Sequence, residues 1–321
     1  WIDGDSSFNT CLGNSGNIKA MASGTMCATC FVGCGAGLTG INAGFDPDAQ
    51  ENLYAGTEAG NASDADTCFN VAIGYRAMKA NTFSDSGVFI GKEAGCSWNG
   101  DDHPVLVGTE AGLKMTGGGK TIAIGYRAGC CAGVSDGSIF IGSYAGAEAC
   151  NRAHGSIFIG GNAGNGGGVP GDVTGDNNIA MGGAALFNFT SGCRNTIIGG
   201  SAANNLSTGY NNVALGYVAL GGGTVTGAYN VAIGEAAGMN ITSAQASVAI
   251  GQDALGCCGT TTGHRNIAIG ARAGKCVTSG EENIFLGSYS GVNIQDGEFN
   301  ILLGRSTMVN VGSGDRNVAV G

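Results

Sequence analysis

Cysteine offers the most chemistry in this sequence, because thirteen occur among 321 residues. Thiols form disulfides in oxidising compartments and often hold zinc in reducing ones. Cys27, Cys30 and Cys34 form a C-x₂-C-x₃-C cluster, a spacing that is open to both interpretations. The histidines that would complete a zinc site lie far from this cluster in the sequence. We therefore expect these three cysteines to be disulfide candidates and expect no metal site.

No group of residues in the sequence points to catalysis. His103, His154 and His264 fall at unrelated places in the repeat described below, and we find no Ser-His-Asp or Cys-His arrangement. The segment Gly35–Gly40 fits G-x-G-x-x-G, but about a fifth of the chain is glycine and no βαβ unit surrounds it. Aspartate pairs such as Asp101 and Asp102 complete no calcium-loop spacing. We expect neither enzyme activity nor a cofactor.

The elements that position the cysteines follow from an internal repeat. A pentapeptide such as Asn230–Gly234 recurs along the chain, and its last glycine marks the period. Ten of the seventeen intervals between these anchor glycines are 17 residues long. The eighteen anchors are Gly13, Gly33, Gly56, Gly74, Gly91, Gly108, Gly125, Gly142, Gly160, Gly182, Gly199, Gly216, Gly234, Gly251, Gly270, Gly287, Gly304 and Gly321. A period this regular predicts one solenoid turn per repeat.

The fold class follows from the residue types at fixed distances from the anchor, which we number position 0. Val, Ile and Leu dominate positions −3 and −1, which share one face of a strand. Ala fills position +3 in 14 of 17 repeats, which indicates close packing against a second strand or turn. We predict an all-β, parallel β-solenoid of about 18 coils. Each coil would contain two short strands and two turns, stacked about 4.8 Å apart.

The repeat also suggests how the chain is organised. We expect residues 1–60 to form irregular first coils with the cysteine cluster and an insertion, and residues 61–321 to form one continuous, regular solenoid. The chain opens on Trp1 rather than Met and stops within a repeat at Gly321. We interpret this as a processed or partial chain that continues beyond residue 321.

Asparagine occupies position −4 in 11 of 18 coils, with Ser or Thr in most of the others. Stacked side-chain amides can hydrogen-bond along such a column. Asparagine also suits a turn for purely local reasons. The two interpretations are compatible.

Seven cysteines lie five to eight residues after their anchors, in one turn of the coil: Cys96, Cys130, Cys131, Cys150, Cys257, Cys258 and Cys276. Cys257 or Cys258 would lie one coil from Cys276, and Cys130 or Cys131 one coil from Cys150. One coil spacing falls within the Cα separation that a disulfide needs. We therefore predict disulfides between adjacent coils and an oxidising compartment.

The four N-x-S/T sequons lie in the same turn of the coil as these cysteines. Each asparagine follows its anchor by five or six residues, at Asn61, Asn188, Asn205 and Asn240. An exposed rim is what glycosylation requires, so these are glycosylation candidates if the source is eukaryotic.

Position −2 is also apolar, although it should face away from positions −3 and −1. A strand that is apolar on both faces is usually buried on both. We expect this column to be exposed on a single chain and covered by further copies of the chain. The interface candidates are Phe31, Phe89, Leu106, Phe140, Phe158, Ile197, Phe285 and Leu302.

The recurring string Asn/Ser-Val/Ile-Ala-Ile-Gly-x-x-Ala resembles the head repeat of YadA-type trimeric autotransporter adhesins, and similar repeats occur in trimeric phage tail fibres. The resemblance covers nearly the whole chain from Asn9 to Gly321. It implies a left-handed parallel β-roll, three chains side by side, and a role in surface attachment.

Charge and hydropathy exclude other classes of function. The net charge is −10 without a basic cluster, which argues against nucleic acid as a partner. No apolar run approaches the roughly 18–20 residues of a membrane-spanning helix. The expected location is extracellular or on a cell or virion surface.

Three functional hypotheses remain. The first is a structural subunit of an extracellular fibre or filament, in which the tail of one subunit stacks on the head of the next. Adhesion to a host or surface receptor could be a second role of this fibre. The second is a receptor-binding tail fibre of a virus or phage. The third is an ice-binding solenoid, which needs a flat column of Thr. We expect the Thr residues here, Thr260, Thr261 and Thr262 among them, to form no such ladder.

Overall fold

The computed structural model describes residues 47–100, 103–148, 153–167, 174–256, 259–309 and 312–321. The chain divides into two compact units, Trp1–Ala43 and Gly44–Gly321, and all described residues belong to the second. The predictions for Cys27, Cys30, Phe31, Cys34 and the first two anchors lie outside the described residues, as do those for Cys150, Cys257 and Cys258.

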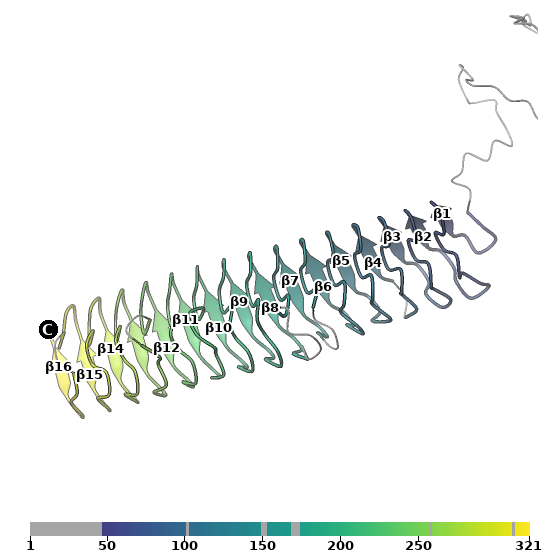
Figure 1. Cartoon of the computed structure of the whole chain (residues 1–321). Coiled ribbons are helices and arrows are strands. Elements are labelled where there is room, and N and C mark those ends of the chain that lie inside the picture. The colour runs from purple at the N-terminus through teal and green to yellow at the C-terminus, as the bar shows by residue number, and fades with distance from the viewer. Residues whose placement is uncertain (1–46, 101–102, 149–152, 168–173, 257–258, 310–311) are drawn as a thin grey trace, which may run out of the picture. The chain divides into compact units, whose positions relative to one another are not determined.

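The second unit is an all-β parallel solenoid of about fifteen turns, as the sequence predicts (Figure 1). Sixteen three-residue strands follow one another in chain order within a single sheet. They are β1 Leu53–Ala55, β2 Val71–Ile73, β3 Val88–Ile90, β4 Val105–Val107, β5 Ile122–Ile124, β6 Ile139–Ile141, β7 Ile157–Ile159, β8 Ile179–Met181, β9 Thr196–Ile198, β10 Val213–Leu215, β11 Val231–Ile233, β12 Val248–Ile250, β13 Ile267–Ile269, β14 Ile284–Leu286, β15 Ile301–Leu303 and β16 Val318–Val320. The left-handed winding implied by the resemblance stays an expectation.

The strands keep one register throughout, although the anchor intervals vary. Position −2 pairs with position −2 even between β7 and β8, whose anchors are 22 residues apart. The strand β1 pairs with β2 in the same register, so regular stacking includes a coil before residue 61. Additional residues are therefore accommodated outside the strands.

The prediction of two strands per coil is wrong for the described residues. Away from the sheet, the coils form only isolated parallel bridges, such as Leu206 with Val225 and Ile241 with Thr261. A tight turn follows each strand instead. In it the anchor glycine has a φ near +130° and the residue at position +2, such as Arg127, has a φ near +57°. Left-handed φ values interrupt the extended conformation that a second strand requires.

Hydrogen bonds between coils continue through this turn. Arg127 donates its N–H to the Thr109 carbonyl of the preceding coil at 3.0 Å, and Gly129 donates its N–H to the Ala145 carbonyl of the following coil at 2.8 Å.

The anchor must be glycine for a second reason besides its positive φ. A Cβ added to Gly108 would lie 2.5 Å from the carbonyl oxygen of Gly125 in the next coil. Stacking at this distance leaves room for hydrogen only.

Asparagine at position −4 forms the predicted amide ladder inside the stack. Asn212 is fully buried and donates Nδ2–H to Asn195 Oδ1 at 3.2 Å and to the Gly227 carbonyl at 2.9 Å. Its own Oδ1 accepts hydrogen bonds from the backbone N–H and the side chain of Asn230. The ladder links successive coils and satisfies backbone groups that water does not reach.

The ladder also determines which residues form the core. Side chains alternate along a strand, so position −2 shares the inner face with the buried asparagine at position −4. Phe89, Leu106, Phe140, Phe158, Ile197, Phe285 and Leu302 all have zero solvent exposure within the single chain. The prediction that these residues form an exposed interface column is therefore wrong. Positions −3 and −1 lie on the opposite face of the strand and point outward.

The residue sizes at positions −2 and +4 of the same coil are related in many coils. Where position −2 is Phe, position +4 is Gly, as in Phe89 with Gly95 and Phe140 with Gly146. Where position −2 is Ala, position +4 is often large, as in Ala214 with Leu220. A Cβ on Gly146 would lie 2.5 Å from the Phe140 ring. In these coils the two positions share the volume of one layer of the interior.

We predict that Asn212→Leu lowers the free energy of unfolding by about 2–3 kcal/mol, because the Gly227 carbonyl and the Asn230 N–H lose a buried partner. Asn212→Ser is the matched control and costs less, because the chain itself places Ser247 at this position. Urea denaturation followed by circular dichroism measures both. Equal stability of the leucine variant and the wild type would contradict a stabilising role of the asparagine ladder.

We predict that Gly146→Ala destabilises the solenoid more than Gly137→Ala does. Both glycines have a φ near +60°, so the backbone strain is matched. A Cβ at Gly146 meets the Phe140 ring, whereas a Cβ at Gly137 meets nothing within 4 Å. Overpacking typically costs about 1–3 kcal/mol, and that difference is the expected result in the same denaturation experiment. Equal destabilisation would mean that the ring moves aside freely.

Candidate interaction face and thiol pocket

The first and last residues of the strands β1–β16, at positions −3 and −1, form a continuous outward surface that we call the aliphatic face. Apart from Thr196 it consists of Val, Ile, Leu, Met and one Ala, without a charged residue. Ile90, Ile124, Ile198 and Ile269 are 37–40% exposed. That value is high for residues that have a neighbour stacked above and below them.

The dimensions of this face follow from strand geometry. Fifteen spacings of about 4.8 Å and three residues of about 3.3 Å give a strip of about 72 by 10 Å. Its area is about 700 Å², above the 300–600 Å² of the largest apolar patch on a typical monomer. A standard stable interface buries about 800 Å² on each partner. The face therefore has the size of an interface.

Charged residues flank the strands at position +2, where oppositely charged side chains of neighbouring coils pair. Arg76 bonds Glu58 at 2.8 Å, and Arg127 bonds Glu110 at 2.6 Å. Hydrogen bonds from Lys79 and then Arg76 lower the pKa of Glu58. These groups are largely solvated, so each pair contributes little stability.

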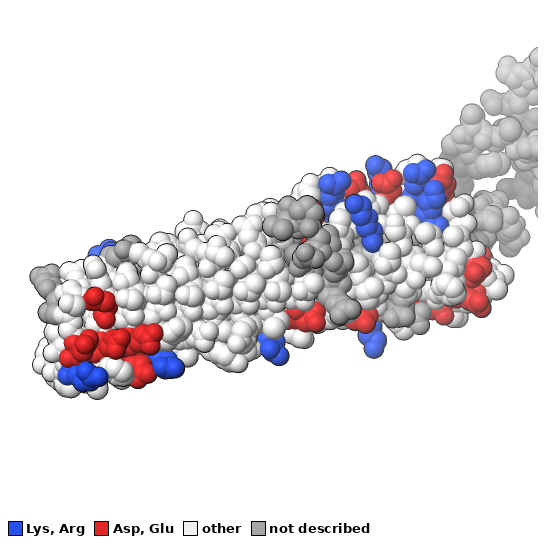
Figure 2. Space-filling view, turned by 60° about the horizontal axis from the view of Figure 1, so that its bottom comes forward, with Lys and Arg blue, Asp and Glu red and all other residues white. Residues whose placement is uncertain are grey.

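Charge is unevenly distributed along the solenoid. Figure 2 shows charged side chains gathered toward the two ends of the stack on the face in view, with a long stretch between them that carries few. Residues 153–252 contain only four charged residues, Asp172, Asp176, Arg194 and Glu235. The central coils are therefore nearly neutral.

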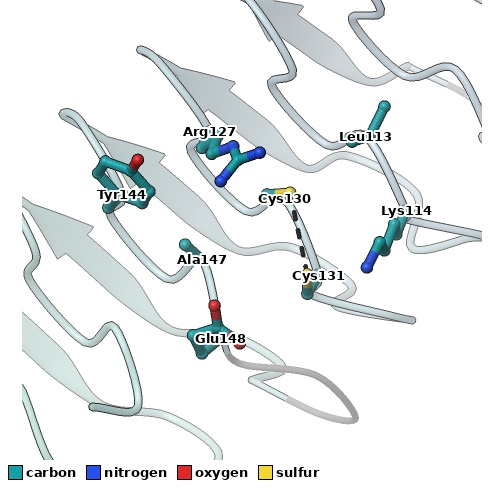
Figure 3. A pocket seen from close by; sticks show the side chains of 8 residues that line it. All are labelled: Leu113, Lys114, Arg127, Cys130, Cys131, Tyr144, Ala147 and Glu148. Atoms are coloured by element: carbon teal, nitrogen blue, oxygen red, sulfur yellow. Dashed lines mark hydrogen bonds between the residues drawn. The ribbon is translucent and has the colours of Figure 1, made fainter. Parts of the chain in front are cut away.

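The cysteine turn contains a small cavity of about 180 Å³ (Figure 3). Cys130 and Cys131 lie in it with their sulfur atoms 3.8 Å apart, and Lys114 and Glu148 line it from the preceding and following coils. Cys130 is buried and Cys131 is half-buried. The hydrogen bond from Cys131 and then burial raise the pKa of the Cys130 thiol.

The predicted disulfides stay predictions. No disulfide joins two described residues. Their predicted partner Cys150 lies outside the described residues, as do Cys257 and Cys258. Cys276 is not among the free thiols.

The sequons differ in their surroundings. Asn61 is exposed, whereas Asn188, Asn205 and Asn240 are half-buried. Asn188 donates Nδ2–H to Asn205 Oδ1 at 2.7 Å, so these two side chains bond each other across one coil spacing. Glycosylation at any of the four stays a prediction.

The histidines have a structural role that the sequence analysis missed. His154 and His264 both occupy position −6, so the expectation that they fall at unrelated places is wrong for these two. Each accepts a backbone N–H of the preceding coil at Nδ1, from Asp136 at 3.1 Å and from Gln245 at 3.0 Å. Asp176 and Asp315 accept equivalent bonds at this position, so a side-chain acceptor at position −6 can bond the preceding coil.

The structure also revises the expectation that no hydroxyl ladder exists. Position −8 is exposed and carries Ser or Thr in seven successive coils: Thr174, Ser191, Thr208, Thr226, Ser243, Thr262 and Ser279. This is a single row at a bend of the coil. The flat sheet itself remains aliphatic, with Thr196 as its only threonine in the described strands. The flat threonine surface required for ice binding is therefore not on the sheet.

No helix in the described part of the chain is long and apolar enough to cross a bilayer. Comparison with protein-family models, with curated protein sequences and with solved structures finds no match for this chain. What is established is the architecture: a parallel β-solenoid of about fifteen turns with an uncharged aliphatic face along its sheet.

Proposed function

We propose that the protein is a structural subunit of an extracellular fibre in which several copies of this chain pack through their aliphatic faces. The observation that carries the proposal is the uncharged face of about 700 Å² that runs along the sixteen strands. Leaving this area in water is costly, at roughly 25 cal/mol per Å² of apolar surface.

The repeat of the face favours another copy of the same chain as its occupant. Val, Ile or Leu side chains recur along it at every coil, and only a surface with the same spacing matches such ridges over many coils. A second solenoid has that spacing by construction. A cyclic arrangement buries the same face on every copy. Two parallel columns, at positions −3 and −1, let each chain contact two neighbours, which suits the trimer that the resemblance implies.

Further features support an extracellular setting. Thirteen cysteines and the exposed sequon asparagine Asn61 suit an oxidising, glycosylating environment. In such an assembly the edges that carry ion pairs and tyrosines stay accessible, including Tyr75 and Tyr126, whose rings lie beneath Arg76 and Arg127. Attachment to a receptor would use these outer edges.

We predict that the variant Ile124→Lys/Ile198→Lys weakens self-association at least about 100-fold, because each charge would have to be desolvated in an apolar interface. Analytical ultracentrifugation over a concentration series measures this association. Circular dichroism should show an unchanged solenoid, since both side chains point away from the core.

Val134→Lys is the matched control, because Val134 is 44% exposed and lies at position −8, away from the sheet. It should associate like the wild type. A wild-type chain that stays monomeric at all concentrations, or a control that dissociates equally, would overturn the proposal.

A further inference from the structure

Two pairs of tyrosines share one backbone geometry, although they flank opposite ends of the strands. Tyr126 and Tyr144 follow the strands β5 and β6, whereas Tyr210 and Tyr229 precede β10 and β11. In each pair the later tyrosine donates its backbone N–H to the carbonyl of the earlier one, at 2.9 Å from Tyr144 and at 3.1 Å from Tyr229. Both donors have a left-handed φ near +60°. Each pair is thus a diagonal step between two adjacent coils.

The two rings of each pair are in contact. Their centroids lie 5.2 Å apart in the first pair and 5.3 Å apart in the second, with interplanar angles of 89° and 78°. These are edge-to-face arrangements. Tyr126, Tyr210 and Tyr229 are 37–55% exposed, and Tyr144 is half-buried. Each pair therefore holds two phenols together at a place that a dissolved reagent can reach.

Further contacts fix the first pair. The guanidinium of Arg127 lies 5.6 Å from the ring centroid of Tyr126 and 5.9 Å from that of Tyr144. A side-chain hydrogen bond with Tyr144 raises the pKa of Tyr126, so the hydroxyl-bearing ends of the two rings meet. The ring carbons at which oxidised phenols couple flank the carbon that carries the hydroxyl. The positions that would react are therefore the ones brought together.

We propose that Tyr126 with Tyr144, and Tyr210 with Tyr229, are sites of dityrosine cross-linking between adjacent coils, with a peroxidase-activated peroxide as the oxidant. The oxidant removes one hydrogen atom from each phenol O–H and leaves two phenoxyl radicals. One C–C bond then forms between their ortho carbons, and the hydrogens on those carbons move to the oxygens and restore both hydroxyls. One H₂O₂ becomes two water molecules, and the chain loses two hydrogen atoms.

The geometry favours coupling within a pair over coupling between chains. Two reacting groups that are held together behave as an intramolecular pair with a high effective concentration. The product would be a covalent bond between neighbouring coils, whose contacts with each other are what stabilise a solenoid. The cross-link forms within one chain, so this inference goes beyond the packing of copies proposed above and its test does not depend on that packing.

The test is oxidation of the full-length chain with a haem peroxidase and H₂O₂ over a series of chain concentrations. Free thiols are alkylated first, because they compete for the oxidant. Peptide mapping by mass spectrometry identifies linked peptides that lack two hydrogen atoms. We expect each of the two proposed links to exceed a link between any other two tyrosines at least about tenfold, with a yield independent of chain concentration.

Tyr126→Phe should abolish only the first link and Tyr229→Phe only the second, because phenylalanine keeps the ring but forms no phenoxyl radical. Tyr217→Phe is the matched control. Tyr217 is 63% exposed and lies beside Gly200 of the preceding coil rather than beside a second tyrosine, so both links should persist. Links from Tyr217 as abundant as either proposed link, or a yield that rises with chain concentration, would overturn the proposal.

Discussion

The close stacking of equivalent residues from coil to coil is the constraint on which the rest of the structure depends. Each residue faces its own counterpart about 4.8 Å away, so only residue types that tolerate a copy of themselves above and below fit a column. The anchor glycines illustrate this, because a Cβ on Gly108 would meet the carbonyl of Gly125. The asparagine column meets the same constraint differently, since an amide can donate in one direction and accept from the other.

The period of the sequence is enough to predict the fold but not to orient its strand. Anchor glycines at 17-residue intervals allow few structures other than a solenoid. The expectation that position −2 is exposed was wrong. Positions −3 and −1 carry Val and Ile and look more apolar than position −2, which mixes Ala and Phe. The better signal is the pairing of sizes, Phe140 with Gly146 and Ala214 with Leu220. Such compensation arises only where two residues share a fixed volume.

The sequence predicts which turn carries the cysteines and histidines but not the geometry of their side chains. The turn that carries the cysteines was found because it lies at a constant distance from the anchor. The separation of 3.8 Å between Cys130 and Cys131 depends on rotamers and on bonds to both neighbouring coils, which no spacing in the sequence encodes. Similarly, His154 and His264 share position −6, but their role as acceptors becomes visible only when the N–H of the preceding coil is located.

The constant register across unequal intervals has a consequence for how such a chain changes over time. The strands β7 and β8 pair like all others although their anchors are 22 residues apart, and β12 and β13 do so at 19. Length variation is thus decoupled from the hydrogen-bonded columns. A gene encoding this protein could acquire short insertions at the bends, coil by coil, while its stack and its outward face stayed unaltered. The strands thus keep a constant spacing along the stack, whereas the bends between them can differ in length and sequence.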